Sequence, residues 1–348
     1  MKRKIERLIL SGGGMKGISY IGVFKYIDEL KKKNKNTINS LKSNEVKNKE
    51  DVLKEDEMQS KDNNLTKDVL KEDVLKEDVL KEDVLKEDEI QSVVEFNIKE
   101  ICCVSVGSIV GFLYILGYTY DEFYDEIIST DLNDVKNFKI KSFFTKYGID
   151  NGKKVTDWII KMIVKKGYSK DMTLRDIWNI FGVNFRVVVS NLNKYEQEIF
   201  DYKTNPNLKV IKAIRMAICI PFLFSVEKYR NFVYVDGGLI NNFPIKMYGD
   251  NLETLLGINI VTKKELDYDV IHEQIDNFND YLFHVMTCLV VQREKEITLS
   301  ELYKEHIIYV KTGNITKTID FCLKEEDKQR LIDIGYETTR DYFERRNR

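Results

Sequence analysis

Three short stretches of the sequence combine residue types and spacings that could perform chemistry. The first is the segment Gly12–Gly17, in which four glycines surround Met15 and Lys16 between an apolar run and a helical pattern. Each ordered glycine costs up to about 1 kcal/mol relative to alanine, so the chain must need bare backbone here. Backbone N–H groups at the start of a helix can stabilise a phosphate or a developing oxyanion.

The second stretch is Cys103-Val104-Ser105-Val106-Gly107, which follows an apolar run and precedes a hydrophobic helical pattern. It matches the nucleophile elbow G-x-S-x-G with cysteine in place of the first glycine. Such an elbow raises a serine hydroxyl above the end of a strand, and small residues on either side avoid clashes. The alternative is that Ser105 only caps the helix, as serine commonly does.

The third stretch is Asp236-Gly237-Gly238, which ends a strand pattern in an open turn. Asp-Gly-Gly alone is a common turn, but together with Ser105 and the glycine loop it favours a general base. Three histidines follow Asp236, which makes the order Ser…Asp…His of a triad formally available. We expect no triad, because two of these histidines lie on one predicted helix and the third opens a strand: His272, His284 and His306.

The glycine loop has a second interpretation, since Gly12-x-Gly14-x-x-Gly17 also fits the dinucleotide fingerprint. That fingerprint requires an acidic residue at the end of the second strand, and the sequence there is CCVSVGS, without a carboxylate. A P-loop is excluded because no Gly-Lys-Ser/Thr follows. An oxyanion hole for acyl transfer is therefore favoured over a phosphate site.

The elements that must position these residues alternate between strands and helices. This order predicts an α/β fold with a mainly parallel central sheet covered on both faces. The sequence TLRDIWNIF carries a capping box, with Thr173 and Asp176 at the required spacing. The expected strands are 6–10, 97–105, 184–192, 196–202, 231–238, 252–260 and 306–310, and the expected helices are 15–32, 108–118, 120–130, 153–166, 173–181, 208–218, 270–296 and 325–345.

A low-complexity insert at 34–95 interrupts a single domain that we expect over 6–348. Its motif DVLKE occurs at 51–55 and four times in tandem over 68–87. A five-residue period builds no continuous apolar helix face, so a solvated, partly helical or disordered insert is favoured over a partner-binding arm. The insert holds opposed blocks of charge, while the whole 348-residue chain has a net charge of −2. The remainder is nearly neutral, which argues against nucleic acid as a partner.

The five cysteines are scattered, without C-x-x-C or metal-ligand spacing. Cys102 and Cys103 lie in an apolar run and are expected to be buried small hydrophobes. We expect a reducing compartment, no metal and no cofactor. The N-terminus does not form a convincing signal peptide and no stretch is long enough to span a bilayer, so the expected localisation is cytoplasmic, with peripheral contact to membranes. Nothing in the sequence predicts an oligomeric state.

Taken together, GGGMKG, SVGSIV after a buried strand, and DGGLINNFPI resemble the motifs of patatin-like phospholipases, and AIRMAICIPFLF resembles the segment that precedes the Asp strand in that family. The resemblance runs from about residue 6 to the C-terminus, apart from the insert. It implies a three-layer α/β/α fold and calcium-independent hydrolysis of lipid acyl esters by a Ser-Asp dyad. It makes Ser105 the nucleophile and Asp236 the base.

The resemblance also assigns the remaining site residues. The backbone amides of Gly13, Gly14 and Met15 would line the oxyanion hole within a loop formed by Gly12, Gly13, Gly14, Met15, Lys16 and Gly17. The elbow and the turn would be supported by Cys103, Gly107, Gly237 and Gly238. Cys103 departs from the glycine of the family motif and puts the elbow geometry at risk.

The sequence thus predicts a phospholipase A-type acyl hydrolase acting on phospholipids or other acyl lipids. An inactive lipid-binding module and, less favoured, a nucleotide-binding α/β protein are the alternatives. Lys16 could bind a headgroup phosphate, although a solvated lysine is favoured. Phe222, Phe224 and Phe243 could line an acyl channel, although ordinary core packing is favoured. The headgroup and the acyl position are not predicted.

Overall fold

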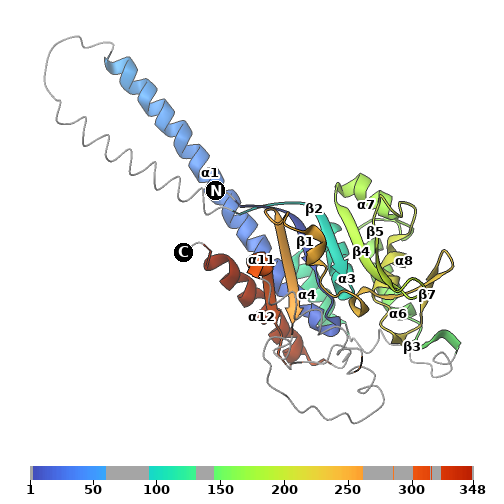
Figure 1. Ribbon diagram of the computed structural model, residues 1–348. Helices are drawn as coiled ribbons and strands as arrows, with labels where there is room; N and C mark the ends of the chain where they lie inside the picture. The colour runs from blue at the N-terminus through green and yellow to red at the C-terminus, as the bar shows by residue number, and fades with distance from the viewer. Residues whose placement is uncertain are drawn as a thin grey trace. The chain divides into compact units, whose positions relative to one another are not determined.

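The computed structural model describes residues 3–59, 94–130, 145–261, 285, 301–313, 315 and 323–346. Its chain forms two compact units, one from Met1–Lys4 and Ile27–Phe96 and a larger one from Ile5–Tyr26 and Asn97–Arg346. Helix α1 (Ser19–Gln59) continues far beyond the expected end at residue 32 (Figure 1). It contains the first DVLKE copy, whereas the tandem copies lie outside the described residues.

The larger unit is built on an eight-stranded sheet with the order β10-β9-β1-β2-β4-β8-β7, and β5 pairs with β4. Strand β9 is parallel to both β1 and β10, and β2 is parallel to β4. The remaining strands, β5, β8 and β7, join in antiparallel pairs. The strands are β1 (Arg3–Leu10), β2 (Val94–Val104), β4 (Asn184–Asn191), β5 (Glu196–Phe200), β7 (Glu227–Tyr229), β8 (Phe232–Asp236), β9 (Leu255–Val261) and β10 (Ile307–Lys311).

The register of three neighbouring strands brings two distant parts of the sequence to the same level. Val104 of β2 lies opposite Val188 of β4, and Val189 of β4 lies opposite Asp236 of β8. Strand β5 takes the other edge of β4 at this level, so β8 lies on the same edge of β4 as β2 and begins where β2 ends. Ser105, the residue after Val104, therefore lies next to Asp236. The carboxyl ends of β2 and β8 thus meet on one edge of β4, where two facing polar side chains can make direct contact.

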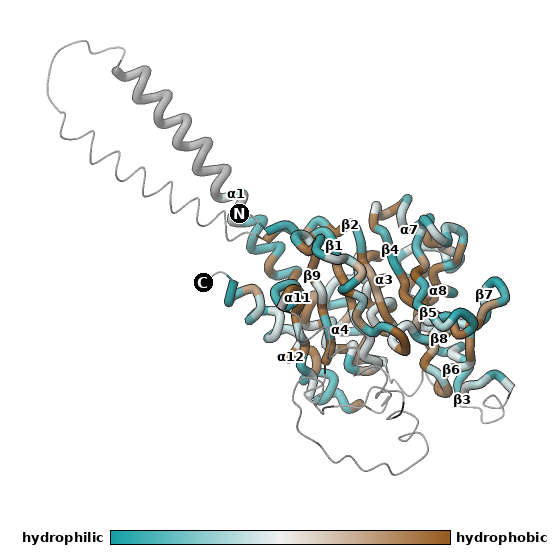
Figure 2. The backbone as a smooth tube through the Cα atoms, viewed as in Figure 1, coloured by the Kyte–Doolittle hydropathy of each residue, from teal (hydrophilic) through white to brown (hydrophobic). Residues whose placement is uncertain are grey.

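Helices cover one face of the sheet. On this face a Cβ at Gly111 of α3 (Val106–Ile115) would meet Ile101, Cys103 and Leu10, so α3 lies directly on β1 and β2. Figure 2 shows the hydrophobic residues gathered on α3 and the strands. The other helical segments are η1 (Gly14–Ile18), α4 (Tyr120–Ser129), α6 (Lys153–Lys165), α7 (Leu174–Phe181), α8 (Val210–Ala217), η3 (Gly237–Leu239), η4 (Ile245–Tyr248), α11 (Glu301–Lys304) and α12 (Glu325–Glu344).

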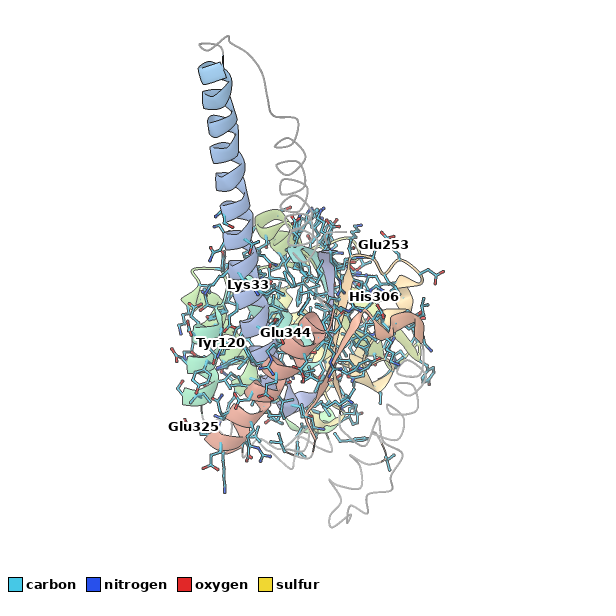
Figure 3. The ribbon with its side chains drawn as sticks, turned by 90° about the vertical axis from the view of Figure 1, so that its left-hand side faces the viewer. Lys33, Tyr120, Glu253, His306, Glu325 and Glu344 are labelled. Atoms are coloured by element: carbon cyan, nitrogen blue, oxygen red, sulfur yellow. The ribbon has the colours of Figure 1, made fainter. Side chains whose placement is uncertain are left out.

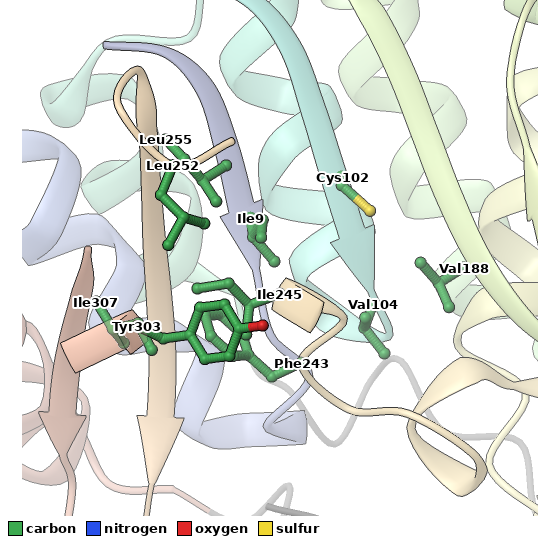
Figure 4. Packing of buried hydrophobic residues seen from close by; sticks show 10 residues of the cluster. All are labelled: Ile9, Cys102, Val104, Val188, Phe243, Ile245, Leu252, Leu255, Tyr303 and Ile307. Atoms are coloured by element: carbon green, nitrogen blue, oxygen red, sulfur yellow. The ribbon is translucent and has the colours of Figure 1, made fainter. Parts of the chain in front are cut away.

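The opposite face of the sheet is covered, in the described part of the chain, by the short helices η4 and α11. Ile9, Cys102 and Val104 alternate with the residues that face α3 and pack into a cluster with Phe243 and Tyr303 (Figure 4). Cys102 and Cys103, adjacent in sequence, thus point to opposite faces because side chains alternate along a strand. Both are buried, as expected from the sequence.

Most of the expected elements are present. The capping box at Thr173 and Asp176 begins α7 as expected, whereas the expected helix 270–296 lies outside the described residues apart from residue 285. The sequence did not predict the small sheet of β3 (Gly148–Asp150) and β6 (Phe222–Phe224). In the described ranges, no helix combines the length and apolar character needed to cross a membrane.

Candidate active site

Ser105 occupies the sharp turn between β2 and α3. Its backbone has φ 50° and ψ −128°, a strained conformation for a residue with a side chain. Its hydroxyl makes no capping bond to α3, so helix capping does not explain this serine. Instead, Oγ donates a hydrogen bond of 2.5 Å to Oδ2 of Asp236.

Asp236 ends β8 and is almost completely buried. Its second carboxylate oxygen, Oδ1, accepts the N–H of Gly238 at 2.8 Å, and its own N–H donates to the Cys219 carbonyl at 2.9 Å. Burial raises the pKa of Asp236 to about 6, against the lowering effect of the hydrogen bonds from Ser105 and Gly238. The carboxylate is therefore ionised at neutral pH, with a pKa close to the range that suits a general base.

Two of the predicted supporting glycines occupy places where a side chain would collide with backbone. A Cβ at Gly107 would lie 2.7 Å from the carbonyl oxygens of Leu10 and Ser11, and a Cβ at Gly237 would lie 2.4 Å from that of Val188. Gly107 thus lets the start of α3 press against the end of β1. Gly237 lets the Asp236 turn approach β4, which brings the carboxylate and the serine to one edge of the sheet.

Cys103 occupies the position where the elbow motif has glycine. Its side chain points toward α3, where a Cβ at Gly111 would lie only 2.6 Å from Sγ. Glycine at 111 therefore supplies the room that the cysteine side chain takes. Burial raises the pKa of the Cys103 thiol well above its usual value, so this thiol stays protonated and the serine is the accessible nucleophile.

The glycine loop passes directly beside Ser105. A Cβ at Gly12 would lie 3.0 Å from Cβ of Ser105 and 2.2 Å from Oδ1 of Asn242. Within the described residues, no hydrogen-bond acceptor contacts the N–H groups of Gly13, Gly14 or Met15. Three backbone donors thus remain available in the segment that borders the serine.

The last two residues of the loop have different surroundings. Gly17 leaves space for the side chain of Val106, which a Cβ would approach within 2.6 Å. Lys16 is only 7% exposed, so the expectation of a solvated lysine is wrong. The residue lies in a tight 3₁₀ turn, in which its N–H donates to the Gly13 carbonyl at 3.2 Å.

A cavity of about 150 Å³ opens beside Ser105 and the glycine loop. Its walls come from α3, α4, α6 and the segment after α8, and nearly all the side chains are apolar. Phe224 belongs to this wall, whereas Phe243 packs on the other face of the sheet and Phe222 is 42% exposed outside the cavity. The lining includes Met15, Ile18, Ile21, Ile109, Val110, Leu113, Phe123, Ile127, Val155, Trp158, Ile218, Ile220 and Phe224.

The structure does not bring a histidine to this site in its described part. His306, labelled in Figure 3, precedes β10 and thus lies at the start of a parallel strand, whereas Ser105 follows the end of one. His272 and His284 lie outside the described residues. In the described ranges, no group of three or more His, Cys, Asp or Glu side chains is placed to hold a metal ion.

Sequence reasoning missed three residues that shape the site. Ser11 and Asn242 contact Gly12, and Gly111 accommodates Cys103. Ser11 directly precedes the glycines and Asn242 lies within the segment DGGLINNFPI, so their position next to or inside the motifs was the available signal. Gly111 is one turn after Gly107 on α3, and only the packing of the helix on β2 reveals its role.

The chain is similar in sequence to known proteins. Residues 79–247 match the family model of the patatin-like phospholipases, which confirms the resemblance that the three motifs indicated. The chain is 29% identical to the uncharacterized protein R571 of Acanthamoeba polyphaga mimivirus over 250 residues, covering 70% of this chain and 82% of that protein. It is 28% identical to the probable lipid hydrolase 463L of Invertebrate iridescent virus 6 over 148 residues, covering 41% of this chain and 50% of that protein.

Among solved structures, VipD from Legionella pneumophila aligns with a TM-score of 0.48 and 15% identity, covering 98% of this chain and 67% of that one.

Proposed function

We propose that this protein is a calcium-independent lipid acyl hydrolase of the phospholipase A type, in which Ser105 is the nucleophile and Asp236 the base. The observation that carries the proposal is the 2.5 Å hydrogen bond from Ser105 Oγ to Asp236 Oδ2 beside an apolar cavity. Similarity to patatin-like phospholipases and to a viral protein named as a probable lipid hydrolase supports it.

The reaction begins when Ser105 Oγ attacks the carbonyl carbon of an acyl ester and its proton passes to Oδ2 of Asp236. The N–H groups of Gly13, Gly14 and Met15 hold the resulting oxyanion, a contribution of about 3 to 4 kcal/mol for a single donor in other enzymes. The ester C–O bond then breaks, and Asp236 returns the proton to the departing alcohol or lysolipid.

Water completes the cycle. Asp236 takes a proton from the water molecule as its oxygen attacks the acyl-enzyme, and the fatty acid leaves while the proton returns to Ser105 Oγ. The apolar walls formed by Leu113, Phe224 and their neighbours suit a fatty acyl chain. The same walls argue against the nucleotide alternative, because a pyrophosphate beside the glycine loop would face hydrocarbon.

The test combines a fluorophosphonate probe with a fatty acid release assay on mixed phospholipid and neutral lipid vesicles in EDTA. We expect wild type to be labelled and to release fatty acid, and Ser105→Ala to do neither. Asp236→Asn should release fatty acid at least about 100-fold more slowly. Wild type that binds vesicles without labelling or release would support the alternative of an inactive lipid-binding module.

A further inference from the structure

We infer that Ser11 is a positioning residue that orients the Gly12–Gly13 peptide, so that the N–H of Gly13 faces the oxyanion formed at Ser105. This inference rests on the proposed function for its catalytic consequence, but its structural part stands on hydrogen bonds alone. Ser11 is completely buried and lies between the end of β1 and the first glycine of the loop.

The Ser11 hydroxyl links the loop to the sheet. The N–H of Ile260 in β9 donates to Ser11 Oγ at 2.9 Å, and Oγ donates to the carbonyl oxygen of Gly12 at 2.9 Å. The phenol of Tyr20, also fully buried, donates to the carbonyl oxygen of Ser11 at 2.9 Å. The Tyr20 phenol oxygen also lies 3.3 Å from Ser11 Oγ and 3.3 Å from the carbonyl oxygen of Ile258. The shortest bond of the Ser11 hydroxyl as a donor is therefore the one to Gly12, and this carbonyl is held from a rigid strand.

Peptide planarity turns this bond into an orientation of the next donor. In a trans peptide the C=O of one residue and the N–H of the next point in opposite directions within one plane. Holding the Gly12 carbonyl toward Ser11 therefore directs the Gly13 N–H away from Ser11. Gly12 also borders Ser105, and within the described residues the Gly13 N–H has no acceptor of its own.

A peptide between two glycines needs such a restraint more than any other, because neither residue has a Cβ to limit rotation. The N–H of Gly12 adds only a long bond of 3.4 Å to the Asn242 carbonyl. That N–H belongs to the preceding Ser11–Gly12 peptide, so the Ser11 hydroxyl supplies the hydrogen bond that restrains the Gly12–Gly13 peptide itself. Without it, the Gly12 carbonyl can rotate toward the site and place an acceptor where a donor is required.

The experiment compares three variants of the full chain: Ser11→Ala, Tyr20→Phe and Thr339→Val. Thr339 is the matched control, because its hydroxyl is also fully buried and donates to a backbone carbonyl, that of Gly335, at 2.7 Å. We expect Ser11→Ala to lower kcat about 10- to 100-fold with KM changed less than about twofold. Tyr20→Phe keeps the Ser11 hydroxyl and should retain kcat within about threefold, and Thr339→Val should match wild type.

Two results would overturn the inference: a Ser11→Ala enzyme with wild-type kcat, or a loss of kcat that follows the melting temperature across all three variants. A crystal structure of Ser11→Ala gives a readout that does not depend on activity. A rotated Gly12 carbonyl supports the inference, and an unchanged carbonyl refutes it. If wild type neither hydrolyses lipid nor reacts with the fluorophosphonate, the proposed function fails while the crystal structure still decides the role of Ser11.

Discussion

Replacing Asp236 by asparagine should make the protein more stable at neutral pH while it destroys catalysis. Burial raises the pKa of this carboxyl from 3.8 to about 6 in the folded chain. Between these two values the unfolded chain has already lost its proton while the folded chain still holds it. The stability of wild type therefore falls as pH rises through this window, and levels off above about pH 6.

The magnitude follows from the width of the window. Each pH unit of pKa difference corresponds to about 1.4 kcal/mol, so the shift of roughly two units amounts to about 3 kcal/mol. Asparagine does not titrate and avoids this penalty, while its amide oxygen can still accept from Ser105 or Gly238. We expect the stability advantage of Asp236→Asn over wild type to grow by about 3 kcal/mol from pH 4 to pH 8.

Urea unfolding of both full chains at half-unit intervals from pH 4 to pH 8 measures this difference. The two chains share all other titrating groups, so the contributions of those groups to the pH dependence cancel. Ser105→Ala is the control, since it abolishes catalysis and leaves the carboxyl able to titrate; its stability should keep falling with rising pH. A difference between Asp236→Asn and wild type that stays constant with pH would show that the buried carboxyl does not carry the penalty argued here.

Further perturbations test the site from other directions. The kcat/KM of wild type should fall about tenfold per pH unit below about pH 6, where Asp236 gains its proton, and stay level above it; a pH-rate profile lacking this limb contradicts the assignment of the base. Gly107→Ala should leave little labelled protein in a fluorophosphonate assay, because its Cβ would collide with backbone. Gly111→Ala should lose about 1 to 3 kcal/mol in urea unfolding, and Cys103→Gly should recover part of that loss, whereas additive effects would argue against their contact. Val155→Trp, which narrows the cavity, should shift fatty acid release toward shorter chains, and an unchanged preference would place the acyl chain elsewhere.

The sequence by itself determined the class of fold and the principal side chains of the candidate site. Strands and helices alternate strongly enough to indicate a parallel α/β sheet, and the motifs around Gly12, Ser105 and Asp236 each contain a chemical requirement that few other residues satisfy. The glycines, the serine of the elbow and the carboxylate of the Asp-Gly-Gly turn are local features. Their residue types can therefore be read without knowing what lies across from them.

The tertiary structure alone decided which residues support that chemistry. The antiparallel register of β8 on β4 brings Asp236 to Ser105, and no local pattern specifies a pairing between distant strands. The room for Cys103 comes from Gly111 on a packed helix, and the hold on Gly12 comes from Ser11, which is itself tied to β9. Burial of Lys16 and the raised pKa of Asp236 have the same origin. Each depends on segments far apart in the chain that exclude water from the side chain, and these segments come together only after the chain has folded.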